Sequence, residues 1–156
     1  MAKQQSLFKP PSLTQLFEPP EGFLGSFGWI CGYTADAGFL NDAVERFTLE
    51  TLAQRAHSGK LAIALMLDPG NPQISPIDVP GVAHLPMRNV AQRPFRLLHA
   101  KVAMLVFRNI EDAADWKLRL IVSTGNWTRS TLEESLDLAW HIELGRQELK
   151  FSPHFS

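Results

Sequence analysis

The sequence predicts an α/β fold, an α+β sandwich in which helices flank a mixed β-sheet. Apolar runs bounded by turn residues indicate buried strands, and one segment in the first third of the chain carries apolar residues at helical spacing. In order, the pattern is one strand, a helix, four strands, a second helix and a last strand, which indicates a mixed sheet. The 156 residues suit a single domain over residues 23–150, preceded by an irregular arm (1–22) and followed by a short tail (151–156).

The first part of the chain contains the expected arm, one strand and one helix. Paired prolines in residues 1–22 remove backbone donors and favour extended geometry, so regular structure is expected to begin near Gly22. The apolar and aromatic segment Phe27–Thr34 predicts a buried strand. Asp36 is placed to cap a helix that ends at Gly59. The apolar positions of that helix are Leu40, Val44 and Phe47.

Turn-bounded apolar runs predict the remaining strands. These strands are Leu61–Leu67, Val82–Met87, Leu97–Phe107, Leu118–Ser123 and Leu138–Leu144. The acidic stretch 109–115 is expected to form a hairpin loop between two of them. Ser130 and Glu133 have capping-box spacing and predict a short helix before the last strand.

The overall composition excludes several classes of protein. A formal net charge of -1 differs from the strongly basic character of non-specific nucleic-acid-binding proteins, although it leaves room for a local basic site. The single cysteine, Cys31, excludes an internal disulfide framework. No segment reads as a secretory signal or as a run long enough to cross a bilayer. We therefore expect a cytoplasmic protein.

The segment Leu97–Phe107 carries two polar residues in an otherwise apolar run. Because side chains alternate along a strand, His99 and Lys101 are expected to point to the same face. Placing an imidazole and an ammonium there costs several kcal/mol, roughly, unless partners compensate, and a bound anion would be such a partner. The alternative interpretation is a core histidine beside a lysine that extends to solvent from a sheet edge.

A second polar group follows the next expected strand, in the turn Ser123-Thr124-Gly125-Asn126. Hydroxyls, a glycine and an amide in one turn can present backbone N–H groups and short side chains to an anion. The predicted hairpin would bring this turn beside Lys101, so the two groups together indicate an anion site. A plain strand-to-helix loop with local caps is the alternative for this turn.

Together the two segments resemble the His-x-Lys and Gly-Ser-x-Asn signature of the phospholipase D superfamily, over roughly residues 23–144. Its members cleave or transfer phosphodiesters without a metal or other cofactor. The resemblance implies a phospholipase D-like half in which His99 is the nucleophile and forms a phosphohistidine. Lys101 and Asn126, with Ser123, Thr124 and Gly125, would bind the phosphate. Asp137 stands where a carboxylate often orients the histidine, or is simply a solvated residue at a helix end.

The sequence departs from the commonest form of this family. Val106 stands where an Asp is usual, and Ser123 stands where a Gly is usual. These departures are similar to those of the tyrosyl-DNA phosphodiesterase branch, which favours a nucleic-acid phosphodiester over a phospholipid as substrate. The chain also has one His-x-Lys pair, whereas metal-free double displacement needs a nucleophile and a general acid. Lysine does not follow at the same spacing after His57, His84, His141 or His154.

The single motif leaves several interpretations open. Two copies of the chain meet as a homodimer to form one site, or the chain is the amino-terminal half of a longer polypeptide, which we favour slightly. A different class of function is a non-catalytic phosphate-binding or assembly module of a larger protein. Transfer of a lipid headgroup is disfavoured, because no amphipathic, membrane-facing stretch is evident.

Other residues near the two motifs carry less weight. Trp127 follows the second motif and is expected to pack under the turn rather than to stack on a base. Four arginines surround the His99 segment, where they either steer an anionic substrate or are ordinary surface charges. They are Arg88, Arg93, Arg96 and Arg108.

Overall fold

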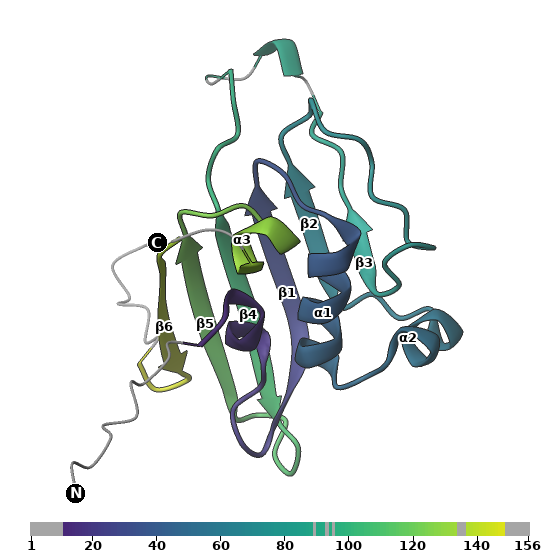
Figure 1. The fold of residues 1–156 in the computed structure, drawn as a ribbon. Coiled ribbons are helices and arrows are strands. Elements are labelled where there is room, and N and C mark those ends of the chain that lie inside the picture. The colour runs from purple at the N-terminus through teal and green to yellow at the C-terminus, as the bar shows by residue number, and fades with distance from the viewer. Residues whose placement is uncertain (1–10, 89, 93, 95, 134–136, 149–156) are drawn as a thin grey trace, which may run out of the picture.

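Residues 11–88, 90–92, 94, 96–133 and 137–148 are described by a computed structural model of the chain (Figure 1). The strands are β1 (Phe23–Gly32), β2 (Ile63–Leu67), β3 (Val82–His84), β4 (Val102–Asn109), β5 (Trp116–Ser123) and β6 (Ala139–Gly145). The helices are the 3-10 helix η1 (Leu13–Phe17), α1 (Ala37–Thr48), α2 (Leu52–Ser58), the 3-10 helix η2 (Val90–Gln92) and α3 (Arg129–Glu133). None of these described helices has the length and apolar character needed to span a membrane.

The six strands form one mixed sheet in the order β3-β2-β1-β4-β5-β6. β1, β2 and β3 run parallel, whereas β4 pairs antiparallel with β1 and continues through β5 to β6 as an antiparallel meander. The expected hairpin loop joins β4 to β5, closed by the Asn109 N–H on the Asp115 carbonyl at 2.9 Å. Helices α1 and α3 lie on the same face of the sheet (Figure 1). The α/β class and the mixed sheet are therefore confirmed.

Helix α1 begins where the sequence predicts it. Asp36 Oδ1 accepts the Phe39 N–H at 2.7 Å, and the apolar face of the helix is fully buried against the sheet. The expected continuation to Gly59 is wrong, because Leu49 adopts a left-handed conformation with φ of 59° and ends the helix. Thr51 caps the separate helix α2, which Gly59 then ends.

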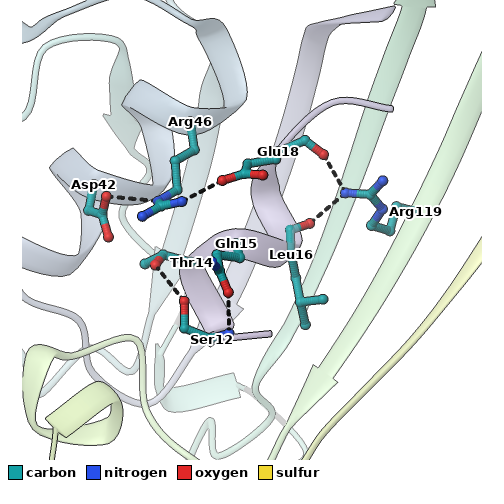
Figure 2. Close-up of polar contacts among 8 residues, drawn as sticks. All are labelled: Ser12, Thr14, Gln15, Leu16, Glu18, Asp42, Arg46 and Arg119. Atoms are coloured by element: carbon teal, nitrogen blue, oxygen red, sulfur yellow. Dashed lines mark hydrogen bonds and ion pairs between the residues drawn. The ribbon is translucent and has the colours of Figure 1, made fainter. Parts of the chain in front are cut away.

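The described part of the expected arm, residues 11–22, is not irregular throughout, and residues 1–10 lie outside the described residues. It contains η1, whose Leu16 and Phe17 are buried in the core beside α1. Arg119 of β5 donates to the carbonyls of Leu16 and Glu18 at 2.7 and 2.6 Å, and Glu18 also pairs with Arg46 of α1 (Figure 2). Packing and these polar contacts override the local effect of the prolines and hold the segment against the domain.

Strand β4 begins at Val102, so the expectation that a strand starts at Leu97 and contains His99 and Lys101 is wrong. The neighbouring strand β1 ends at Gly32, and its last pair with β4 joins Cys31 to Val102. Residues before Val102 therefore lack that neighbour. The Leu98 N–H instead donates to the Asp68 side chain, at 2.8 Å. The expected strand over Val82–Met87 is likewise shorter and ends at His84.

The two faces of the sheet differ in what covers them. One face packs on η1, α1 and Trp127 and contributes Ile30, Leu105 and Ile121 to the core. Because side chains alternate, the residues between them point to the other face. In the three antiparallel strands these residues are apolar except for Arg108 at the end of β4; the main ones are Val102, Met104, Val106, Leu118, Leu120, Val122, Trp140, Ile142 and Leu144. We call this second surface the open face, because no described helix packs against it (Figure 1).

Candidate functional site

The residues of both motifs gather at one edge of the sheet, where β1 and β2 end and β4 begins. His99 and Lys101 lie in the segment just before β4, and Ser123 is the last residue of β5. The Ser123 N–H donates to the Lys101 carbonyl at 3.0 Å, so the backbone joins the two motifs directly. Ligand sites of α/β sheets are commonly found at this edge, beyond the carboxyl ends of parallel strands.

Lys101 and His99 contact one another, although they do not lie on a strand as expected. The Lys101 ammonium lies 3.1 Å from His99 Nδ1, 3.5 Å from Nε2 and 3.3 Å from the His99 carbonyl oxygen. Lys101 is only 7% exposed, whereas His99 is exposed to solvent. Among the described residues, the ammonium has no carboxylate partner. The site therefore holds a buried positive charge beside a solvent-accessible imidazole.

Two residues that the sequence interpretation missed hold His99 in place. The Tyr33 ring, just beyond β1, lies 5.3 Å from the His99 ring with a 42° tilt. Asp68, just beyond β2, is buried, and its two carboxylate oxygens accept the Leu98 N–H at 2.8 Å and the Gly70 N–H at 3.0 Å. The sequence does mark Asp68, because an acidic residue directly after a buried apolar strand often belongs to a functional site. No local sequence pattern marks Tyr33, because its contact with His99 depends on the strand pairing.

The second motif forms a compact turn. The Ser123 hydroxyl accepts the Gly125 N–H at 3.0 Å. A Cβ on Gly125 would lie 2.3 Å from Thr131 and 2.7 Å from the Asp137 carboxyl, so only glycine fits this position without displacing its neighbours. Asn126 follows, and its Oδ1 is buried without a hydrogen-bond partner in the described part of the chain. The turn therefore leaves one amide with hydrogen-bonding capacity that the fold does not use.

Asp137 contacts this turn and not the histidine. Its Oδ1 accepts the Thr124 hydroxyl proton at 3.0 Å, and the Leu138 N–H donates to Thr124 Oγ1 at 2.9 Å. No described hydrogen bond joins Asp137 or Asn126 to His99. The structure thus brings Lys101 together with His99, and Thr124 together with Asp137, as two adjoining groups.

Trp127 and Asp36 fix the turn to the core. Trp127 is fully buried, packs edge-on against Phe17 and donates its indole N–H to the Cys31 carbonyl at 3.0 Å. The expectation that it packs under the turn is confirmed. Asp36 Oδ2 accepts the Arg129 N–H at 2.9 Å while Oδ1 caps α1, so one carboxylate ties the start of α1 to the start of α3.

The arginines and the other histidines lie in several different places. Arg108 is at the far end of β4 from His99, where it donates to Ser26 and to the Ala113 carbonyl, and so does not surround the site. Arg88 and Arg96 are exposed, and Arg93 lies outside the described residues. His57 belongs to α2 and His84 to β3, and His141 lies in β6 as expected. His154 falls outside the described residues.

The site is open. Two surface hollows formed by described residues lie elsewhere, one beside Asp112 and Gly145 and one beside Glu18 and Ile110. Within the described part of the chain, no group of three or more His, Cys, Asp or Glu side chains is arranged to hold a metal ion. Comparisons of the chain with models of known protein families, with curated proteins and with solved structures found no match.

Proposed function

We propose that the His99 group is one half of a phosphodiester-cleaving site of the phospholipase D type, which acts through a phosphohistidine intermediate. The observation that carries the proposal is the buried Lys101 ammonium beside the exposed imidazole of His99. A buried charge is costly unless an opposite charge accompanies it, and the described residues supply none. A phosphodiester anion bound beside His99 would accept a hydrogen bond from the Lys101 ammonium, which contacts the imidazole in its absence.

Asn126 supports the same proposal. Its side chain follows the turn that the Ser123 backbone connects to Lys101, and its buried Oδ1 has no described partner. A carboxamide offers two N–H donors as well as an acceptor, so it suits a phosphate oxygen. Lys101 and Asn126 would then hold different non-bridging oxygens while His99 faces the phosphorus.

The reaction proceeds as a double displacement. A ring nitrogen of His99 attacks phosphorus, a P–N bond forms, and the P–O bond to the leaving alcohol breaks. The leaving oxygen takes its proton from an imidazolium that the second half supplies. That imidazole, now neutral, accepts a proton from water as the water oxygen attacks phosphorus, and the P–N bond breaks to release His99. The resemblance to the tyrosyl-DNA phosphodiesterase branch favours a nucleic-acid phosphodiester as the substrate.

The test is turnover of bis-p-nitrophenyl phosphate in EDTA, followed by release of p-nitrophenolate. We expect His99→Ala and Lys101→Ala each to lower the rate by about 10²-fold or more. His57→Ala is the matched control, because His57 is an exposed histidine on α2 far along the chain from both motifs. Turnover that persists in His99→Ala would contradict the nucleophile assignment.

A second candidate function is a non-catalytic phosphate-binding or assembly module. The contact of Asp137 with Thr124 favours it, because no carboxylate among the described residues then orients the imidazole of His99 for nucleophilic attack. This module would bind inorganic phosphate and lose that affinity in Lys101→Ala. It would release no p-nitrophenolate at any concentration, which separates it from the enzyme.

A further inference from the structure

Strands β1 and β4 are apolar on both sides, and β5 and β6 carry their apolar residues on the open face, opposite Lys117, Arg119 and Glu143. The described helices cover only the other face. On the open face, Met104 of β4 lies opposite Leu120 of β5, and Val122, near the end of β5, lies opposite Trp140 of β6. Phe27 of β1 lies opposite Val106 of β4. Phe27 is 52% exposed and Trp140 is 55% exposed. An antiparallel sheet with one solvated face normally alternates apolar with polar residues, whereas strands apolar on both faces are buried on both. The open face therefore has the composition of a covered surface.

The open face also has the size of a protein interface. Strands of about seven residues, six of them spaced about 4.8 Å apart, present roughly 600 Å² of flat surface. Two such faces would bury roughly 1,200 Å² in total, the lower end of the range of about 1,200–2,000 Å² for stable interfaces. Contiguous apolar patches on monomers rarely exceed a few hundred Å². The surface is large enough for one stable contact between two proteins.

The charge of the open face selects the kind of partner. In the described strands its alternate positions are uncharged except for Arg108, which stands at the far end of β4. Nucleic acid and anionic lipid headgroups require lysines and arginines, which this surface lacks. A flat and uncharged surface is complementary to itself, because a two-fold contact brings no like charges together.

We propose that the open face is where a second copy of this chain docks, sheet against sheet, to form a symmetric homodimer. The inference does not rest on the chemistry of the His99 group. Two sheets packed in this way would interdigitate the apolar side chains of both open faces, about 10 Å apart. Met104 would lie near the centre of the contact, and Val122 nearer to the end of β5.

Sedimentation or light scattering of the full chain tests the proposal. We expect a mass near 35 kDa, twice the 17.5 kDa of one chain, at micromolar concentration. Met104→Lys and Val122→Lys should each give a monomer with an unchanged circular-dichroism spectrum, since both residues point away from the core. Ile77→Lys is the matched control, because Ile77 is an exposed apolar residue in the loop before β3, and it should leave the dimer intact.

The single cysteine gives an independent readout, because Cys31 lies on β1 between Ile30 and Gly32 of the core face and so points to the open face. Its alkylation by a maleimide at pH 8.5 should slow at least tenfold as the protein concentration rises through the dimerisation range. A monomer at every concentration would overturn the proposal, and protection of Cys31 in such a monomer would show that another segment of the same chain covers the face. A dimer that survives both lysine variants would overturn it as well, because its contact would lie elsewhere.

Discussion

At the scale of single residues, the buried charge of Lys101 lowers the stability of the fold, whereas the proposed function requires it. Its ammonium is buried against the His99 ring without a described counter-ion. We expect Lys101→Met to raise the free energy of unfolding by about 1 kcal/mol, because a flexible apolar side chain of similar length replaces an uncompensated charge. The measurement is urea unfolding. The exposed Lys60 provides the control, and Lys60→Met should leave stability unchanged.

The same variants test anion binding. Inorganic phosphate at about 100 times its Kd should stabilise the wild-type protein by roughly 2.7 kcal/mol, through mass action on the folded state. This stabilisation should disappear in Lys101→Met and persist in Lys60→Met. Equal stabilisation of all three proteins would show that phosphate binds somewhere other than beside Lys101.

His84 gives the fold a dependence on pH that is separate from the site. Its Nδ1 accepts the Ile74 N–H at 2.8 Å, and burial lowers the pKa of this imidazole. The unfolded chain binds a proton at His84 near pH 6.5 while the folded chain does so only at lower pH, so stability is present above about pH 6.5 and is lost as the pH falls below it.

Urea unfolding between pH 7.5 and 5 should therefore show a smaller loss of stability in His84→Gln than in the wild-type protein. His57→Gln should behave as the wild-type protein does, because His57 is exposed on α2. Identical pH dependence in all three proteins would contradict the assignment of this loss to His84.

At the scale of elements, the sequence predicts most strands because their apolar runs are bounded by clear turn residues. β2 and β6 lie within two residues of their expected positions at both ends, and the capping position of α1 is correct. The extent of β4 was not predictable, because it depends on where its neighbour β1 ends and on the hydrogen bond from the Leu98 N–H to Asp68. η1 was not predictable for a related reason, since the contacts that hold Leu16 come from Arg119, which lies far along the chain.

In the candidate site, too, local sequence patterns could be predicted, whereas contacts between residues far apart in the chain could not. His99, Lys101 and the turn through Asn126 form recognisable local patterns, although the contact between His99 and Lys101 forms before β4 and not along a strand. The partners Tyr33 and Asp68 come from the ends of other strands, so only the sheet order brings them to the site.

Substitution of Asp68 tests whether the segment before β4 positions His99. In Asp68→Asn, one carboxylate oxygen becomes an N–H₂ group that cannot accept from a backbone amide. We expect faster hydrogen exchange at Leu98 and a decrease in kcat for phosphodiester cleavage of about tenfold, with little change in KM, because Lys101 still binds the phosphate. Asp78→Asn is the control, since its exposed carboxylate lies in the loop before β3. Unchanged exchange at Leu98 would show that the carboxylate does not hold this segment.

At the scale of the whole molecule, the open face and the single His-x-Lys pair point to the same requirement. The proposed reaction needs two imidazoles, one as the nucleophile and one as the general acid. The described part of one chain provides a single imidazole in contact with a buried lysine, that of His99. The uncovered apolar face provides a surface on which two chains associate. A homodimer would supply both histidines, and both should then be needed for turnover.

Mixing wild-type chains with His99→Ala chains measures this requirement directly. If chains pair at random and each site needs two copies of His99, activity falls as the square of the wild-type fraction, so an equimolar mixture keeps about one quarter of it. The two proteins are unfolded and refolded together so that the chains exchange, and p-nitrophenolate release is measured at constant total protein. An equimolar mixture with His57→Ala should keep full activity. A linear decline to one half in the His99→Ala mixture would show that each chain works with one histidine of its own, and would restrict the dimer to a structural role.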